Sequence, residues 1–256
     1  MSDNWNTYMT YIDHKPASFL LDLDPWGSGE YDHFIHLYQL RLVLNEPTDE
    51  GLTTNEEASD LYAIEDAIHD VLSGHYLFVG RITTDGRRDF FYYTDSDDGS
   101  ELKRLAAKHI VSHKYSVDRV EEQSPRSFYE QFLYPDQLSW KRMLNRQLVD
   151  KLTELGDDLR KPRPVNHWIY FSSEESCRLF MKKVQKEGFQ IEEQNRQQDR
   201  YSLRISRKDE VQLHAINEVT DFLVHAAQEC NGDYDGWETQ VIEQKSILGG
   251  LKKMFR

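Results

Sequence analysis

The most constraining feature of the sequence is the order of apolar segments in its last third. Between Tyr201 and Ser206, apolar and polar residues alternate with the period of a half-buried strand. The expected elements are a strand at 167–171, a helix from Ser172 to Gly188, strands at 189–193 and 201–206, a helix from Asp209 to Gly232, and a strand at 237–242. The order β-α-β-β-α-β predicts a ferredoxin-like domain.

The N-terminal half carries a second pattern of strands and helices. Strands are expected at 4–12, 17–23, 34–44, 76–82, 89–93 and 115–120, with helices that open at Thr54 and Asp98. Glu57 follows Thr54 by three residues, which is the spacing of a capping box. Asp85-Gly86 favours a tight hairpin because both residues tolerate positive φ. The pattern predicts an α+β sandwich with a mostly antiparallel sheet and helices on one face.

Prolines mark the expected domain boundary. Lys161-Pro162-Arg163-Pro164 predicts a stiff linker, because proline fixes φ and disfavours helix in the preceding residue. A chain of 256 residues suggests two domains, at roughly 150 residues each. We expect an acidic α+β domain at 1–135, a connector helix and linker at 136–165, a ferredoxin-like domain at 166–245 and a basic tail at 246–256.

The charge is distributed unevenly along the chain. Residues 1–160 hold 30 acidic against 16 basic side chains, which accounts for the net charge of −14, whereas residues 161–256 hold 15 of each. An acidic surface repels phosphate backbones, so we expect no direct DNA binding by the N-terminal half. Its acidity serves either solubility alone or attraction to a basic partner surface.

Two features indicate a cytoplasmic protein. The only cysteines, Cys177 and Cys230, lie in helix-like segments among apolar neighbours, which is typical of reduced core thiols. No stretch approaches the roughly 18 apolar residues of a membrane helix, and no signal peptide is visible. We therefore expect no membrane association.

The motifs of catalysis and cofactor binding are missing from the sequence. No glycine pattern matches a phosphate-binding loop, and no G-x-S-x-G elbow is present. His33 and His36 would point to opposite faces of a strand, and His109 and His113 lack an accompanying metal-ligand motif. We expect no catalytic residue, no metal and no cofactor, and hence no enzyme.

One face of the predicted C-terminal sheet carries candidate binding residues. Trp168 and Tyr170 share a face of their strand, and Arg204 is expected on the same face of its neighbour. These aromatics either dock within the chain, bind a protein partner or stack on RNA bases, although the RNP1 pattern of RNA platforms is missing. The basic tail forms either an amphipathic helix or a frayed end.

The segment Tyr234-Asp235-Gly236-Trp237 carries a family resemblance. With the preceding helix, it resembles the regulator of ribonuclease E activity B (RraB) family, over about residues 165–245. The resemblance implies a ferredoxin-like fold and non-catalytic binding and inhibition of ribonuclease E. Tyr234, Asp235 and Trp237 then serve either as partner contacts or as structure, with Asp235 bonded to the local backbone, Gly236 freeing the turn and Trp237 filling the core.

The N-terminal half carries its own resemblance. Trp5, Val79-Gly80-Arg81 and Arg88-Asp89-Phe90 resemble an uncharacterised domain that is often fused ahead of an RraB module. The leading hypothesis is therefore a macromolecule-binding regulator whose partner is a protein, with an RNA-processing ribonuclease as the expected one. An immunity or antitoxin-like protein and a small-molecule-binding α+β domain remain alternatives.

Overall fold

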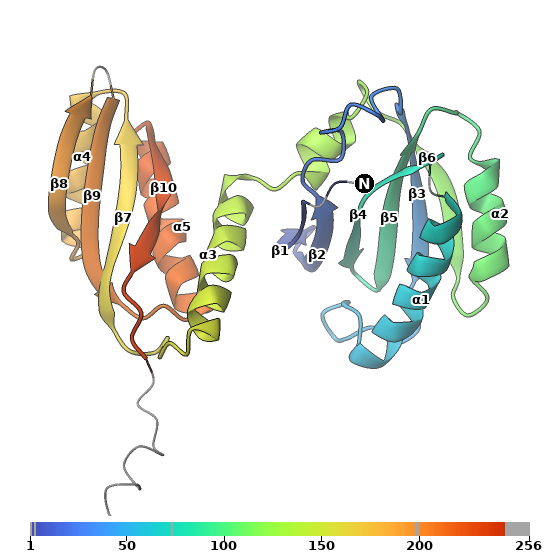
Figure 1. Cartoon of the computed structure of the whole chain (residues 1–256), viewed down its shortest axis with the longest axis horizontal. Coiled ribbons are helices and arrows are strands. Elements are labelled where there is room, and N and C mark those ends of the chain that lie inside the picture. The colour runs from blue at the N-terminus through green and yellow to red at the C-terminus, as the bar shows by residue number, and fades with distance from the viewer. Residues whose placement is uncertain (1, 3, 73, 198–199, 244–256) are drawn as a thin grey trace, which may run out of the picture. The chain divides into compact units, whose positions relative to one another are not determined.

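The computed structural model describes residues 2, 4–72, 74–197 and 200–243. The chain divides between Ser139 and Trp140 into two units (Figure 1). Both units are α+β, and each is built on one antiparallel sheet, as predicted. None of the helices in the described part of the chain is both long and apolar enough to cross a membrane.

The N-terminal unit is built on a six-stranded sheet. The strands are β1 (Trp5–Ile12), β2 (Lys15–Asp22), β3 (His36–Val43), β4 (Leu77–Thr84), β5 (Arg87–Thr94) and β6 (Tyr115–Val120), in the order β1-β2-β4-β5-β3-β6. Its helices are α1 (Asn55–Leu72), α2 (Ser100–His109) and a π-helical turn, η1 (Tyr129–Leu133). Asp85 and Gly86 have φ values of 46° and 72°, so the predicted hairpin between β4 and β5 is confirmed.

Both faces of the six-stranded sheet are covered. The two α-helices lie together on one face (Figure 1), where Leu61 and Leu105 join a core with Leu40 and Phe90. The expectation of helices on one face holds for α1 and α2. The opposite face is covered by aromatic residues outside these helices, and these make ring contacts between Trp26 and Tyr93, Trp26 and Tyr129, and Phe128 and Phe91.

The described part of the C-terminal unit contains three helices and a four-stranded sheet. Its elements are α3 (Gln137–Glu154), β7 (Arg163–Phe171), α4 (Glu174–Lys186), β8 (Gln190–Gln197), β9 (Arg200–Asp209), α5 (Leu213–Glu229) and β10 (Gly232–Thr239). The sheet order is β10-β7-β9-β8, and every neighbouring pair is antiparallel. From β7 to β10 the chain follows the predicted order β-α-β-β-α-β, which is that of a split β-α-β unit.

Strand pairing corrects two predicted boundaries. Arg163 and Pro164 pair with Asp209 and Lys208, so the second half of the expected Lys161–Pro164 linker is strand. The same pairing extends β9 through Asp209, and α5 begins only at Leu213. The helix that was expected to open at Asp209 therefore starts one turn later, because a ladder with β7 satisfies the backbone there.

The last strand also begins earlier than predicted. β10 covers Gly232–Thr239 instead of 237–242, so Tyr234 to Trp237 lie within the strand. The register against β7 shifts between Tyr234 and Gly236, which makes this segment a β-bulge and not a turn. The expected tail at 246–256 lies outside the described residues.

A buried ion pair stabilises the region before β7. Arg163 donates from Nη2 to Oδ1 of Asp157 at 2.7 Å, and both side chains are almost fully buried. Oδ2 of Asp157 also accepts the Ile242 N–H at 2.6 Å. The pair thus ties the end of α3 to the segment after β10.

Candidate functional site

Strand β7 separates the C-terminal sheet into two chemically different faces. Val165, His167, Ile169 and Phe171 are buried, whereas Asn166, Trp168 and Tyr170 between them are partly exposed. This alternation follows from the two-residue period of a strand. The buried side contacts the helices, for example through the Phe171 and Phe180 rings at 5.3 Å, and Figure 1 shows α4 and α5 together on one side of the sheet.

The structure brings Trp168, Tyr170 and Arg204 together. Trp168 pairs directly with Arg204 of β9, and Tyr170 pairs with Ser202. Directly paired residues share a face, so all three predicted residues lie on the side away from α4 and α5. We call this side the open face; its members are Asn166, Trp168, Tyr170, Glu193, Ser202, Arg204, Asp233 and Glu238. Within the described part of the C-terminal unit, no helix covers it.

Two arginines of β9 contact other residues of the open face. The guanidinium of Arg200 lies 3.9 Å from the Tyr170 ring centroid, which is a cation–π contact. Nη2 of Arg204 lies 3.3 Å from Oε2 of Glu193. Carboxylates on β8 and β10 surround these groups, so the face combines a Trp and a Tyr with charges of both signs. That composition is typical of a protein interface.

A polar hollow lies at one end of the same sheet. It has a volume of about 400 Å³ and is lined by residues of β7, β8 and β9 together with the loop before β8. Lys208 and Arg207 give it positive charge, and Ser206 donates a hydrogen bond to Glu192 at 2.6 Å. The hollow gives the open face a recess in which a partner side chain could be seated.

Tyr234, Asp235 and Trp237 lie elsewhere than the first three candidates. Tyr234 is 1% exposed, and its hydroxyl lies 2.9 Å from Nδ1 of His167 on the helix-covered side. Burial raises the pKa of Tyr234 and lowers the pKa of His167 to about 3, so this pair is uncharged. Tyr234 is therefore a core residue.

Asp235 and Trp237 contact helix α3. The carbonyl oxygen of Asp235 accepts from Nζ of Lys141 at 2.7 Å, and Nε1 of Trp237 donates to Oδ1 of Asn145 at 2.8 Å. Trp237 is only partly buried, so the expectation that it fills the core is wrong and Tyr234 takes that place. Gly236 has no positive φ and does not serve the turn that was expected.

Asn145 was missed by sequence reasoning. It is 2% exposed, and its Nδ2 donates to Asn217 at 2.8 Å and to Thr220 at 2.7 Å on α5. With the Trp237 bond, one amide links α3, α5 and β10. The available signal was a polar residue among the apolar positions of the predicted helix at 136–155.

Ser112, His113 and Glu57 lie next to one another in the N-terminal unit, which raises the question whether they form a catalytic triad. Oγ of Ser112 lies 2.9 Å from Nδ1 of His113, and Nε2 of His113 lies 3.0 Å from Oε1 of Glu57. All three groups are within hydrogen-bonding reach, but the serine faces Nδ1 and the carboxylate faces Nε2, which is the reverse of the serine-hydrolase triad. His113 is 8% exposed.

The surroundings of this set favour a structural role. The Glu57 carboxylate also accepts the backbone N–H groups of Asn45, at 2.6 Å, and Glu46, at 3.3 Å. The adjoining cavity is lined by Glu46, Glu56 and Asp60, whose charge opposes the oxyanion of acyl transfer. Glu57 therefore joins the first turn of α1 to two loops. Its long-range bonds replace the reciprocal bond of the predicted capping box, of which only the Thr54 half, at 3.4 Å, is present.

The described residues offer no obvious metal centre. No group of three or more His, Cys, Asp or Glu side chains among residues 2, 4–72, 74–197 and 200–243 is arranged to hold a metal ion. Cys177 and Cys230 are both buried free thiols, and burial raises the pKa of each. Neither thiol therefore has the lowered pKa of a reactive cysteine.

The fold defines a two-domain α+β protein whose smaller domain has one sheet face without α4 and α5. The family model described as "Regulator of ribonuclease activity B" matches residues 142–239, and that described as "Family of unknown function (DUF695)" matches residues 3–134. Since the second match covers more than half of the chain, the chain belongs to the DUF695 family. The region that follows in the sequence, residues 142–239, matches the RraB family. Both resemblances predicted from the sequence are confirmed.

The remaining comparisons do not inform the fold or the function. No curated protein matches the chain. A solved structure described as an unknown protein from Galdieria sulphuraria is 12% identical, with 80% of this chain and 99% of that chain covered and a TM-score of 0.23. A putative glycine cleavage system transcriptional repressor is 9% identical, with 80% and 98% covered and a TM-score of 0.23. We draw nothing about fold or function from scores this low.

Proposed function

We propose that this chain is a non-catalytic, cytoplasmic regulator that binds a ribonuclease through the open face of its C-terminal sheet. The observation that carries the proposal is the RraB match at 142–239, a family of regulators of ribonuclease activity, on a domain whose open face carries two partly exposed aromatic residues. Trp168, Tyr170 and Arg204 are the proposed contact residues. The buried free thiols of Cys177 and Cys230 suit a reducing cytoplasm.

The chemistry of the open face favours a protein over RNA as its ligand. Bases stack on exposed aromatic rings, but the ring of Tyr170 already carries the Arg200 guanidinium. Glu193, Asp233 and Glu238 lie on the same face, and their carboxylates repel a phosphate backbone. A protein surface can instead pair with these carboxylates while it covers Trp168.

The acidic N-terminal unit supports the choice of a ribonuclease. Enzymes that act on RNA hold its phosphates with Lys and Arg and therefore carry basic surfaces. Residues 1–160 carry the whole net charge of −14, and α1 alone contains six acidic residues and no Lys or Arg. This unit would attract such an enzyme over a distance, while the open face provides the contact. Association should then weaken as salt is raised.

The test is capture of a ribonuclease by the full chain and inhibition of its RNA cleavage. The double variant Trp168→Ala, Tyr170→Ala should lose both, by at least about tenfold in affinity, since aromatic hot spots contribute about 2 kcal/mol or more. Leu179→Ala is the matched control, because Leu179 is 49% exposed on α4, on the other side of the same sheet. Unchanged capture by the double variant would show that the contact lies elsewhere.

The identity of the captured protein tests the other half of the proposal. A captured protein without nuclease activity, such as a toxic enzyme of another class, would replace the ribonuclease with an immunity-type partner. Capture that is insensitive to salt, and to Asp→Asn and Glu→Gln substitutions of exposed residues on α1, would contradict the role of the acidic unit.

A further inference from the structure

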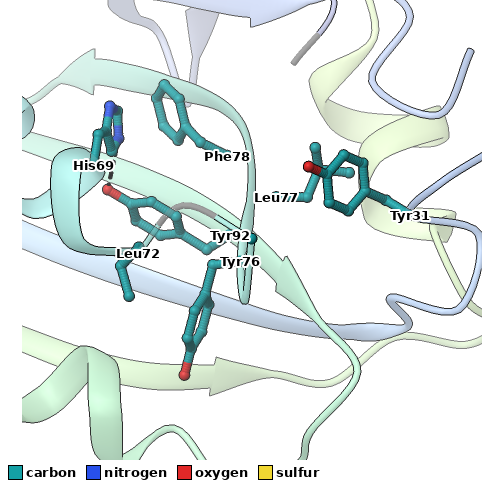
Figure 2. Close-up of a pocket in the computed structure, with 8 residues that line it drawn as sticks. Tyr31, His69, Leu72, Tyr76, Leu77, Phe78 and Tyr92 are labelled. Carbon is teal, nitrogen blue, oxygen red and sulfur yellow. Dashed lines mark hydrogen bonds between the residues drawn. The ribbon is translucent and has the colours of Figure 1, made fainter. Parts of the chain in front are cut away.

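The N-terminal unit contains a cavity whose walls are mostly aromatic. It lies where the C-terminal end of α1 meets the start of β4, and its volume is about 140 Å³. Five of its lining side chains are rings: Tyr31, His69, Tyr76, Phe78 and Tyr92. Figure 2 shows Tyr31 on the far side of the cavity from His69 and Tyr92. Rings therefore approach the space from two directions.

Two pairs of rings on the inner side meet nearly at right angles, whereas Phe78 is tilted by 39° to Tyr92 and by 45° to His69. The planes of Tyr76 and Tyr92 cross at 87° with centroids 6.5 Å apart, and those of His69 and Tyr92 cross at 74° with centroids 5.7 Å apart. At such a corner, the face of one ring and the edge of another point toward the same space. Such boxes of aromatic rings are the usual recognition sites for methylated ammonium groups, whose positive charge is attracted by the faces of the rings.

The rings are held in place by the fold. Nε2 of His69 and the Tyr92 hydroxyl lie 3.0 Å apart, and Tyr92 is 1% exposed. Phe78 is stacked on Trp5 at 5.3 Å on one side and contacts His69 at 4.2 Å. Since these side chains are fixed by their neighbours, the cavity exists before a ligand binds, and little conformational entropy is lost on binding.

The charges around the cavity select the sign of its ligand. Burial lowers the pKa of His69 to about 4, so the ring carries no positive charge at neutral pH. Asp66 and Asp70 act electrostatically on His69, and Asp98 and Glu101 act on Tyr76. The nearby cation Arg81 is paired with Glu65. The site is therefore lined by uncharged rings with carboxylates behind them, an arrangement that favours a cation and disfavours an anion.

We propose that this cavity binds a small organic cation that carries a methylated ammonium group. The group enters the aromatic corner made by Tyr76 and Tyr92, and Tyr31 closes the other side. Its charge is stabilised by the ring faces and, at longer range, by Asp66 and Asp70. The proposal is independent of the open face, because every lining residue belongs to the N-terminal unit.

Choline and its uncharged tert-butyl analogue test the proposal on the full chain. The two probes have nearly the same shape, so a difference in affinity reports the charge. Calorimetry should give one site for choline with a Kd of about 1 mM or tighter, and at least about fivefold weaker binding of the analogue. The N-methyl proton signal of bound choline should move upfield, because ring faces shield protons that lie over them. Equal affinities, or no saturable binding of choline, would overturn the proposal.

Substitutions at the rim locate the site without disturbing the core. Tyr31 lies in a loop and is partly exposed, so Tyr31→Ala should fold and weaken choline binding by about fivefold. Tyr11→Ala is the matched control, since Tyr11 is 71% exposed on β1 and does not line the cavity. Unchanged affinity in Tyr31→Ala, or an equal loss in the control, would place choline elsewhere.

A second pair of substitutions isolates the electrostatic part. Asp70→Asn should weaken choline binding by about twofold and leave the uncharged analogue unaffected, because one exposed carboxylate near the site loses its charge. Asp60→Asn is the control on the same helix and should change neither affinity. An equal effect of both substitutions would show that choline senses only the net charge of the unit, and the cavity would lose its assignment.

Discussion

The two sheets of this chain are covered differently, and this difference determines which parts of each sheet are open to a ligand. The six-stranded sheet has α1 and α2 on one face, while ring contacts from Trp26 and Tyr129 cover the other. The four-stranded sheet packs one face on α4 and α5 and leaves Trp168 and Tyr170 partly exposed on the other. A sheet covered on both faces leaves only its edges and ends open to a ligand, whereas a sheet covered on one face also leaves the other face open.

The two units nevertheless share local structural features. Each sheet contains a β-bulge next to a glycine, at Gly80 in β4 and at Gly236 in β10. Each unit also contains a histidine whose ring nitrogen lies about 3 Å from a tyrosine hydroxyl, His69 on helix α1 and His167 on strand β7. Matched substitutions at these places, and at the buried ion pair of the C-terminal unit, therefore test how far the comparison holds.

The largest effect is expected at the buried ion pair of the C-terminal unit. Asp157→Asn should lower the free energy of unfolding of this unit by about 3–5 kcal/mol at pH 7, because the Arg163 charge stays buried without its partner. Hydrogen exchange resolved by peptide should show the loss in residues 140–243 and not in the six-stranded sheet. Equal loss in both units would show that they unfold together.

Asp157→Asn should also change how the free energy of unfolding of the C-terminal unit depends on pH. Burial alone would raise the pKa of Asp157, but hydrogen bonds from Arg163 and the Ile242 N–H hold it below its usual value. A carboxylate with a lowered folded-state pKa stabilises the fold above its unfolded pKa, and that contribution is lost as pH falls through the folded pKa. The difference between wild type and Asp157→Asn should therefore shrink below about pH 4. Asp221→Asn removes a more exposed pair, with Arg142, and should change stability by at most about 1 kcal/mol.

Replacement by alanine should destabilise the protein at one bulge glycine and have almost no effect at the other. Gly80 has a φ of 154°, and an added Cβ would lie 2.5 Å from the Leu20 carbonyl oxygen, so Gly80→Ala should destabilise the N-terminal unit by about 2–4 kcal/mol. Gly236 has no such φ, and a Cβ there meets nothing within 4 Å, so Gly236→Ala should stay within about 0.5 kcal/mol. Urea unfolding of both variants measures the contrast. A large loss in Gly236→Ala would mean that its bulge needs glycine for another reason.

Local patterns predicted the elements and one face of the candidate site. The strand at 115–120 was placed correctly, and alternation along β7 placed Trp168 and Tyr170 on one face because a strand has a fixed period. The paired strand then carried Arg204 to the same face. These predictions needed only the chain near each residue and the order of the strands.

Features set by distant partners could not be predicted. β9 runs through Asp209 because Arg163 pairs with it, which overrides the local helix signal there. Whether Glu57 bonds its own helix or His113 depends on a residue 56 positions away. The aromatic cavity likewise joins Tyr31, His69 and Tyr92 from three separate segments, and no spacing in the sequence relates them.

His167, which is buried, and His69, which is partly buried, should respond alike when the pH falls. Burial lowers the pKa of His69 to about 4 and that of His167 to about 3, below the unfolded value of 6.5. Each therefore stabilises its unit above pH 6.5, and this contribution falls by about 1.4 kcal/mol per pH unit as the pH drops toward the folded value. Proton NMR should show neither ring titrating between pH 8 and about 5.5.

Removing the tyrosine hydroxyls tells whether burial is the cause. In Tyr92→Phe and Tyr234→Phe the histidines stay buried, so their pKa values should remain below about 5. A return of either pKa toward 6.5 would assign the shift to the hydrogen bond instead. A difference between the two variants would show that the two histidine–tyrosine pairs depress the histidine pKa for different reasons.

A small effect on stability is also expected where the two sheets differ most. Trp168→Ala should change the unfolding free energy by less than about 1 kcal/mol, because the ring lies on the open face, whereas Ile169→Ala should cost about 2–5 kcal/mol because Ile169 is 0% exposed against the helices. Urea unfolding measures both, and ribonuclease capture measures what the tryptophan does instead. A cost for Trp168→Ala as large as that for Ile169→Ala would mean that this face is covered in the folded chain. The four-stranded sheet would then be enclosed like the larger one, and its partner would have to bind at an edge or an end.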